Sequence, residues 1–271
     1  MNVAQQTKDP RIAKRAAEVA VASRNSTEAL DAVRLWVNNA PHSDEALQNY
    51  ISLLSINGQY PELKQVLSDR LKNATDSERK SLIIRSQQVL SEIKDQKNTF
   101  SVIYDITKPY QNLPETHIAL SQSAYAIGNN ALAQAEAEKA LSLQPDSALA
   151  ILTLAQSLTN TSEATALIAK FVDKHPQADD VRLAYARELS EQKQYAQAQQ
   201  QFELLLNKNP NSLSILYALA ITHIQQSHWE QASQYLKTYL QQLANQPELQ
   251  SDPTQAQLLL SQEEEEQGHY D

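Results

Sequence analysis

Apolar residues recur along this chain at the three- and four-residue spacing of amphipathic helices, and the segment 179–212 shows this most clearly. Val181, Tyr185 and Leu189 fall on one face of a first predicted helix. The apolar positions of a second helix and the proline that ends it are Ala198, Phe202, Leu205, Leu206 and Pro210. The pattern predicts two antiparallel helices, with small residues where the helices approach most closely.

The same arrangement recurs with a period of about 34 residues, which is typical of helical repeat arrays. Small residues of the second helices stand at Ala164, Ala198 and Ala232, which are 34 residues apart. Prolines that end second helices stand at Pro145, Pro176 and Pro210, at intervals of 31 and 34 residues. The chain is therefore predicted to be a stack of helix hairpins.

Counting from that register divides the sequence into a polar segment 1–9 and an array over 10–271. The predicted units are 10–43, 44–73, a degenerate unit 74–113, 114–147, 148–178, 179–212, 213–246 and a half unit 254–271. The half unit is expected to hold one helix that ends at Gly268 and Tyr270, with an apolar face that lacks a hairpin partner. We expect either a fragment of a longer protein or a terminus covered by another chain.

The units resemble tetratricopeptide repeats, and the resemblance covers nearly the whole chain. It implies an all-α fold, an α-solenoid of helix hairpins forming a right-handed superhelix. First helices would line its concave face and second helices its convex face. Each unit would contact only its neighbours, so stability would be roughly additive along the array.

Composition supports a helical array and excludes several classes of protein. Three glycines in 271 residues are too few for a phosphate-binding loop and a turn-rich sheet. The net charge is -9, whereas a nucleic-acid-binding protein usually carries a basic surface. The chain has no cysteine and no apolar run long enough to span a membrane, so we expect a soluble chain whose export signal, if any, lies upstream.

No catalytic arrangement is evident, and we predict neither enzymatic activity nor a cofactor. His223 and His228 are five residues apart, a spacing that does not align two side chains for a metal ion. His223 and His117 are instead expected to pack in the core, where the repeat usually places an aromatic residue. The run Glu263–Glu266 points in several directions around a helix and is expected to be a solvated surface.

By the resemblance, groove-facing positions of the first helices turn apolar from the middle of the chain onward. The predicted groove residues are Ile118, Tyr125, Leu152, Leu183, Arg187, Tyr217, Ile221 and Ile224. Such a surface would suit an extended or helical peptide. The alternative is that several of these residues pack against the adjacent unit. The carboxylate clamp of some repeats is not expected, because Ile118 with Gln122 and Leu183 with Arg187 replace its lysine and asparagine.

Basic residues gather near the start of this acidic chain. Arg11, Lys14 and Arg15, with Arg24 and Arg34 further on, lie in the first unit. They form either an ordinary helical surface or a docking face for an acidic partner.

A narrower resemblance concerns RIAKRAAEVA, ALDAVRLWV, DVRLAYARELSEQKQYAQAQQQFELLL and WEQASQYLKTYL. These stretches are similar to the repeat region of Gram-negative envelope lipoproteins of the LbcA type, which are adaptors of a carboxyl-terminal processing protease. The resemblance implies a non-enzymatic adaptor that recruits substrates to that periplasmic protease. It also implies an outer-membrane lipid anchor upstream of this sequence, with a cytoplasmic location as the alternative. The other function considered is a structural scaffold for a pilus or polysaccharide-export machine.

Overall fold

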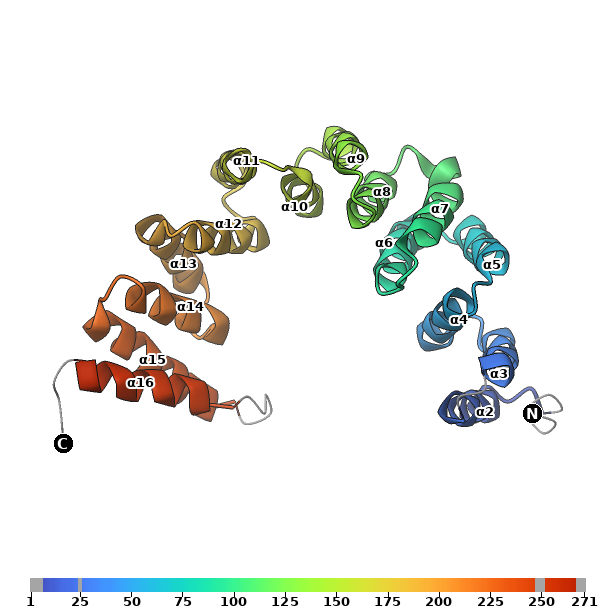
Figure 1. Ribbon diagram of the computed structural model, residues 1–271, viewed down its shortest axis with the longest axis horizontal. Helices are drawn as coiled ribbons and strands as arrows, with labels where there is room; N and C mark the ends of the chain where they lie inside the picture. Colours follow the sequence, from blue (N-terminus) through green and yellow to red (C-terminus); the bar gives the residue numbers. More distant parts are fainter. Residues whose placement is uncertain (1–6, 24–25, 247–251, 267–271) are drawn as a thin grey trace. The chain divides into compact units, whose positions relative to one another are not determined.

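The computed structural model describes residues 7–23, 26–246 and 252–266 (Figure 1). Within these ranges the chain forms fifteen α-helices, one short 3-10 helix and no strand. This confirms the predicted all-α solenoid of helix hairpins. No helix in the same ranges is both long and apolar enough to cross a bilayer. The predicted helix end at Gly268 and Tyr270, Arg24 and the side chains of Glu263–Glu266 lie outside what the structure describes.

The chain divides into two compact units, Met1–Thr159 and Asn160–Asp271. The first unit contains α2 (Pro10–Ala22), α3 (Ser26–Asn39), α4 (Asp44–Ile56), α5 (Tyr60–Asn73), α6 (Asp76–Ser91), α7 (Gln96–Thr107), η1 (Lys108–Tyr110), α8 (Pro114–Ala126), α9 (Asn130–Leu143) and α10 (Ala148–Ser157). The second contains α11 (Thr161–Lys174), α12 (Asp179–Glu191), α13 (Tyr195–Lys208), α14 (Leu213–Ile224), α15 (Trp229–Ala244) and α16 (Thr254–Glu266). The repeat boundaries counted from the sequence stay a prediction.

Four of the hairpins turn through the same backbone motif. A residue two or three positions beyond the end of the first helix has a positive φ in each case: 66° at Gly58, 76° at Gly128, 59° at Lys193 and 58° at Ser227. The next backbone N–H donates to the carbonyl five residues earlier, for example from Asn129 to Ala124 at 2.9 Å. This Schellman arrangement satisfies carbonyls that the end of a helix leaves without partners. It also reverses the chain into the second helix.

Helix starts are fixed by polar caps that the sequence supplies. The Ser147 hydroxyl accepts a hydrogen bond from the Ala150 backbone N–H at 3.2 Å, and Ser43 caps α4 in the same way through Ala46. Thr75 and Glu78 form a reciprocal capping box at the start of α6. Each cap satisfies backbone donors that have no partner inside the helix.

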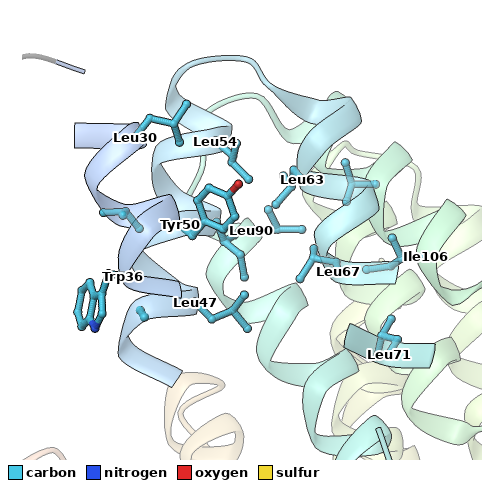
Figure 2. Packing of buried hydrophobic residues seen from close by; sticks show 14 of the residues in the cluster. Leu30, Trp36, Leu47, Tyr50, Leu54, Leu63, Leu67, Leu71, Leu90 and Ile106 are labelled. Atoms are coloured by element: carbon cyan, nitrogen blue, oxygen red, sulfur yellow. The ribbon is translucent and has the colours of Figure 1, made fainter. Parts of the chain in front are cut away.

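Small residues lie at the closest helix contacts, as predicted. Ala186 and Ala198 are both fully buried between α12 and α13. In the first unit the Ser121 hydroxyl of α8 donates to the Ala133 carbonyl of α9 at 2.7 Å, which requires two backbones in close approach. Figure 2 shows large side chains filling the space beside such contacts, where Leu63 and Leu67 lie near Leu90. The core is thus a row of interhelical layers.

Candidate functional site

The first helices of unit 1 present one continuous surface. α6 packs against α4 and α8, and α8 packs against α10 (Figure 1). Two hollows of about 350 Å³ each open on this surface, one between α4 and α6 and one across α6, α8 and α10. We call the surface around these two hollows the unit-1 groove. Residues that line it include Gln48, Ile84, Arg85, Gln88, Glu92, Gln122, Tyr125, Leu149 and Gln156.

Three glutamines run across this groove at equivalent positions. Gln88, Gln122 and Gln156 are separated by 34 residues each and lie in the last turns of α6, α8 and α10. Gln88 lines both hollows, and the other two line the second. In the described part of the chain none of the three side-chain amides has a hydrogen-bond partner. Each amide therefore keeps two donors and one acceptor for a ligand.

Apolar surface accompanies the glutamines in the second hollow. Tyr125 is 43% exposed and Leu149 is 42% exposed, and Ile84 forms part of the same wall. Exposed large apolar side chains beside free amides are a combination typical of peptide-binding surfaces. The groove can therefore hold a main chain by hydrogen bonds and a side chain by apolar contact.

Charged residues bound the other end of the groove. Arg85 of α6 donates to the Asp44 carboxylate of α4 at 2.6 Å, and the pair is about half exposed on both sides. Glu92 lines the same hollow and has no ion-pair partner among the described residues. The groove thus changes from mixed charge at α4 to neutral amides at α10.

Of the residues predicted for the groove in unit 1, Tyr125 is the one that lines it. Ile118 is 2% exposed and packs with Ala140 and Ala150, so it cannot contact a ligand. Its predicted exposure is wrong, because its side chain faces the α9 and α10 helices instead of the groove. Leu152 is half-buried on α10 and does not line either hollow.

Most of the groove residues predicted in unit 2 are half-buried. Leu183 packs at the edge of the cluster around Phe202, and Arg187 on the same helix is exposed. Tyr217 is half-buried, with its ring centroid 5.5 Å from that of Tyr239. Ile221 and Ile224 are half-buried on α14. The hollows described above belong to unit 1, so a peptide-binding role of these residues stays a prediction.

The basic residues near the start of the chain are neutralised by neighbouring carboxylates. Arg11 pairs with Asp9 at 2.8 Å, Lys14 with Glu45 at 2.7 Å, and Arg15 with Glu18 at 2.9 Å. The hydrogen bond from Arg11 holds the pKa of Asp9 below its ordinary value, and the Glu45 carboxylate raises the pKa of Lys14. The predicted docking face at Arg11, Lys14 and Arg15 is therefore not an uncompensated positive surface.

His117 and His223, the two histidines expected to pack in the core, are both buried. His223 is 4% exposed, with its ring stacked on Tyr235 at 5.4 Å, and burial lowers its pKa. His117 lies 2.6 Å from the Glu136 carboxylate in the core of the α8–α9 hairpin. Among the described residues, no group of three or more His, Cys, Asp or Glu side chains could hold a metal ion.

Sequence reasoning missed the glutamine row. The apolar pattern that predicts the groove residues does not include Gln88 or Gln156, and it places Gln122 only at the position of a clamp residue. The signal was present in the sequence, because the three glutamines keep the same 34-residue interval that defines the repeats.

Comparison with known proteins supports the repeat assignment for part of the chain. Residues 189–258 match the family model described as tetratricopeptide repeat. A search of curated proteins gave no significant match.

Several solved structures are similar to this chain. The chain is similar to a tetratricopeptide repeat protein from Parabacteroides merdae at 12% identity, covering 94% of this chain and 98% of that one, with a TM-score of 0.49. It is similar to TTC0263 of Thermus thermophilus at 13% identity, covering 66% and 99%, with a TM-score of 0.48. It is also similar to YrrB, described as having an unusual peptide-binding site, at 13% identity, covering 65% and 91%, with a TM-score of 0.44. Likenesses this remote carry no argument about function. The match identifies tetratricopeptide repeats over residues 189–258, and helix hairpins of the same kind are present in both units.

Proposed function

We propose that this protein is a non-enzymatic scaffold that binds an extended segment of another polypeptide along the unit-1 groove. The observation that carries the proposal is the row of Gln88, Gln122 and Gln156, whose amides face a hollow without partners among the described residues. A primary amide matches the main chain of a peptide, because it donates to a carbonyl and accepts from an N–H. Binding through the main chain tolerates many ligand sequences.

The spacing of the row fits an extended ligand. Packed helices lie about 8–10 Å apart, and an extended chain advances about 3.3 Å per residue. A segment that crosses α6, α8 and α10 would therefore meet one glutamine about every third residue. Tyr125 and Leu149 would contact the side chains between those anchor points. A rigid row of this kind lowers the entropic cost of holding the ligand.

Photo-crosslinking tests the groove directly, with a matched control on the same unit. Tyr125 in the groove and Tyr104 on the second helix α7 are both exposed tyrosines. Each is replaced separately by benzoylphenylalanine, and the protein is irradiated in the cells that produce it. We expect crosslinked polypeptides at position 125 and none at position 104. Equal crosslinking at both positions, or none at 125, contradicts a groove-bound ligand.

Alanine replacement of the row tests the proposed contacts. Gln88→Ala, Gln122→Ala and Gln156→Ala together should reduce crosslinking at position 125 by about ten-fold, because several ligand hydrogen bonds are lost. Gln65→Ala and Gln134→Ala, on the second helices α5 and α9, are the control and should leave crosslinking unchanged. Helicity measured by circular dichroism should be equal in both variants. Unchanged crosslinking in the triple variant would show that the amides do not bind the ligand.

A finer role rests on the resemblance to envelope lipoproteins of the LbcA type. In this role the protein recruits substrates to a periplasmic carboxyl-terminal processing protease, and a lipid anchor upstream of this sequence attaches it to the outer membrane. The groove would hold a substrate and raise its effective concentration at the protease. The identities of the proteins crosslinked at position 125 test this role. Proteins that accumulate when the protease is deleted support it, whereas components of a pilus or polysaccharide-export machine favour a structural scaffold.

A further inference from the structure

A third hollow, of about 310 Å³, opens between α2, α3 and α4 at the start of unit 1. Its wall includes Glu18, Val21, Trp36, Glu45 and Asn49, and we call it the Trp36 hollow. We propose that the Trp36 hollow binds a lysine or arginine side chain of the partner polypeptide. The inference rests on the scaffold function proposed above and adds a preference for a basic residue in the ligand.

An aromatic face forms part of this hollow and already attracts a cation. Trp36 belongs to the first hydrophobic cluster and is 5% exposed, and Figure 2 shows its ring at the edge of the labelled side chains. The Lys14 ammonium lies 5.5 Å from the centroid of the Trp36 ring. Tryptophan is the side chain that attracts a cation most strongly through its ring face. The position of Lys14 therefore indicates which kind of charge the hollow accepts.

Two carboxylates at the hollow each use one oxygen for a cation of the chain. Glu45 accepts from Lys14 through Oε2, and Glu18 accepts from Arg15 through Oε2. The Oε1 atom of each carboxylate has no partner among the described residues. Asn49 donates its amide N–H to the Glu45 backbone carbonyl at 2.8 Å, which leaves its own oxygen as a further acceptor.

Apolar residues of the hollow would contact the methylene groups of the bound lysine or arginine. Val21 is 47% exposed and lines the hollow together with Ala17 and Val33. Lysine and arginine place their methylene stems along apolar surface while the charged head stays at polar partners. An apolar wall, an aromatic ring and carboxylate oxygens together match such a side chain. A neutral or acidic side chain would donate no charged hydrogen bond to the two Oε1 atoms.

The ligand proposed here is positively charged, whereas the basic residues near the start of the chain predict an acidic partner. Lys14 and Arg15 are each held by a carboxylate, so they do not offer free positive charge. The partner's cation instead competes with Lys14 for the face of Trp36 and for Glu45. Lys14 is thus an internal occupant that a ligand has to displace. Removal of its charge should strengthen binding.

Tryptophan resonances provide a direct readout in the full chain. The protein has two tryptophans, so Trp229→Phe leaves Trp36 as the single indole. Its ¹⁵N–H signal is followed by NMR while two capped peptides are added separately. One is acetyl-Ser-Gln-Ser-Arg-Ser-Gln-Ser-amide, and the other has citrulline, a neutral isostere of arginine, in place of its arginine. We expect the arginine peptide to shift the Trp36 signal and to bind about ten-fold more tightly than the citrulline peptide.

Three variants in the same background separate the hollow from general charge effects. Glu18→Gln with Glu45→Gln should remove the preference for arginine over citrulline. Glu138→Gln, an exposed carboxylate on the second helix α9 that lines none of the three hollows, should leave that preference unchanged. Lys14→Met should increase the affinity for the arginine peptide about three-fold, because the competing ammonium is gone. A gain in affinity cannot come from a misfolded variant.

The outcomes distinguish this inference from the scaffold function itself. Equal binding of the two peptides, or no change at Trp36 with either, overturns the basic preference. If crosslinking at position 125 still depends on the glutamine row in that case, the groove function stands without it. If the arginine peptide binds at Trp36 while the glutamine row has no effect on crosslinking, the groove function fails and the Trp36 hollow is a separate site.

Discussion

His117 of α8 and Glu136 of α9 form a buried pair, with Nδ1 of the ring 2.6 Å from Oε2 of the carboxylate. The other ring nitrogen, Nε2, lies 2.8 Å from the Gln111 backbone carbonyl. Both ring nitrogens therefore lie within hydrogen-bond distance of an oxygen acceptor. Lys139 donates to the remaining oxygen of Glu136 at 2.7 Å. The pair thus joins α8, α9 and the segment before α8.

Glu136→Gln should destabilise the protein at neutral pH by about 1–3 kcal/mol, because His117 and Lys139 lose a charged hydrogen-bond acceptor. Burial raises the pKa of Glu136, but hydrogen bonds from Lys139 and His117 outweigh it and hold the pKa below its ordinary value of 4.5. A lowered pKa stabilises the folded state above pH 4.5, and this stabilisation is lost as the pH falls through the folded-state pKa.

Urea unfolding of the wild type and Glu136→Gln at pH 7 and at pH 3 measures this effect. The difference in unfolding free energy should be present at pH 7 and become smaller at pH 3. Glu138→Gln, an exposed neighbour on α9, should change neither value. A difference that is the same at both pH values would show that the carboxylate charge does not stabilise the fold.

In unit 2 an arginine and a glutamine occupy the positions that His117 and Glu136 occupy in unit 1. Arg182 stands in its repeat where His117 stands, and it donates to the Gln201 side chain at 2.6 Å and to the Pro176 carbonyl at 3.4 Å. The partners lie nineteen residues later and six residues earlier, as Glu136 and Gln111 do for His117. The equivalent residues of four other repeats, Ala13, Leu47, Ile151 and Leu216, are apolar and buried.

Because apolar residues fill this position elsewhere, the double variant Arg182→Leu, Gln201→Leu should be neutral or more stable by up to about 4 kcal/mol. Gln201→Leu alone should cost about 1–3 kcal/mol, because it leaves a buried guanidinium with one fewer acceptor. Thermal and urea unfolding of the three proteins check both statements. A double variant less stable than Gln201→Leu alone contradicts this interpretation.

Lys193 and Ser227 occupy the turn position that Gly58 and Gly128 occupy in other hairpins, and all four have positive φ. A left-handed conformation costs a residue with a β-carbon about 1–2 kcal/mol. We therefore expect Lys193→Gly and Ser227→Gly to stabilise the protein by about 0.5–1 kcal/mol each, after the larger unfolded-state entropy of glycine is subtracted.

The reverse changes act as the control for this prediction. A β-carbon at Gly58 or Gly128 would meet no atom within 4 Å, so any cost of alanine there is conformational. Gly58→Ala and Gly128→Ala should each destabilise the protein by about 1 kcal/mol in urea unfolding. Equal stability of all four variants and the wild type would show that the turn conformation is not strained.

Tyr217 and Tyr239 join α14 to α15 through their rings, and both belong to the cluster around Leu236. Tyr217→Ala should therefore lower the stability of unit 2 in addition to any effect on a ligand. A double-mutant cycle with Tyr239→Ala should give a coupling free energy of about 0.5–1.5 kcal/mol, the range for aromatic pairs. Additive effects of the two substitutions would indicate that the rings do not interact.

The sequence determined the architecture because repeat proteins encode it locally. Alanines such as Ala186 and Ala198 mark close helix contacts, and apolar spacing marks the buried faces, so the hairpins followed from short segments. Buried histidines were predicted at His117 and His223 for the same reason. Both the helix hairpins and the buried histidines depend only on residues of one repeat and the repeat beside it.

The groove depended on tertiary structure, because an apolar residue has the same pattern whether it faces a ligand or the next helix. Ile118 and Tyr125 both met the predicted pattern, yet one is buried between helices and the other is exposed in a hollow. The pairing of Lys14 with Glu45 joins residues of two helices, and no spacing within a single helix reveals it. Local periodicity therefore specified the helices of this protein, whereas the packing of one helix pair on the next decided which side chains remain available to a partner.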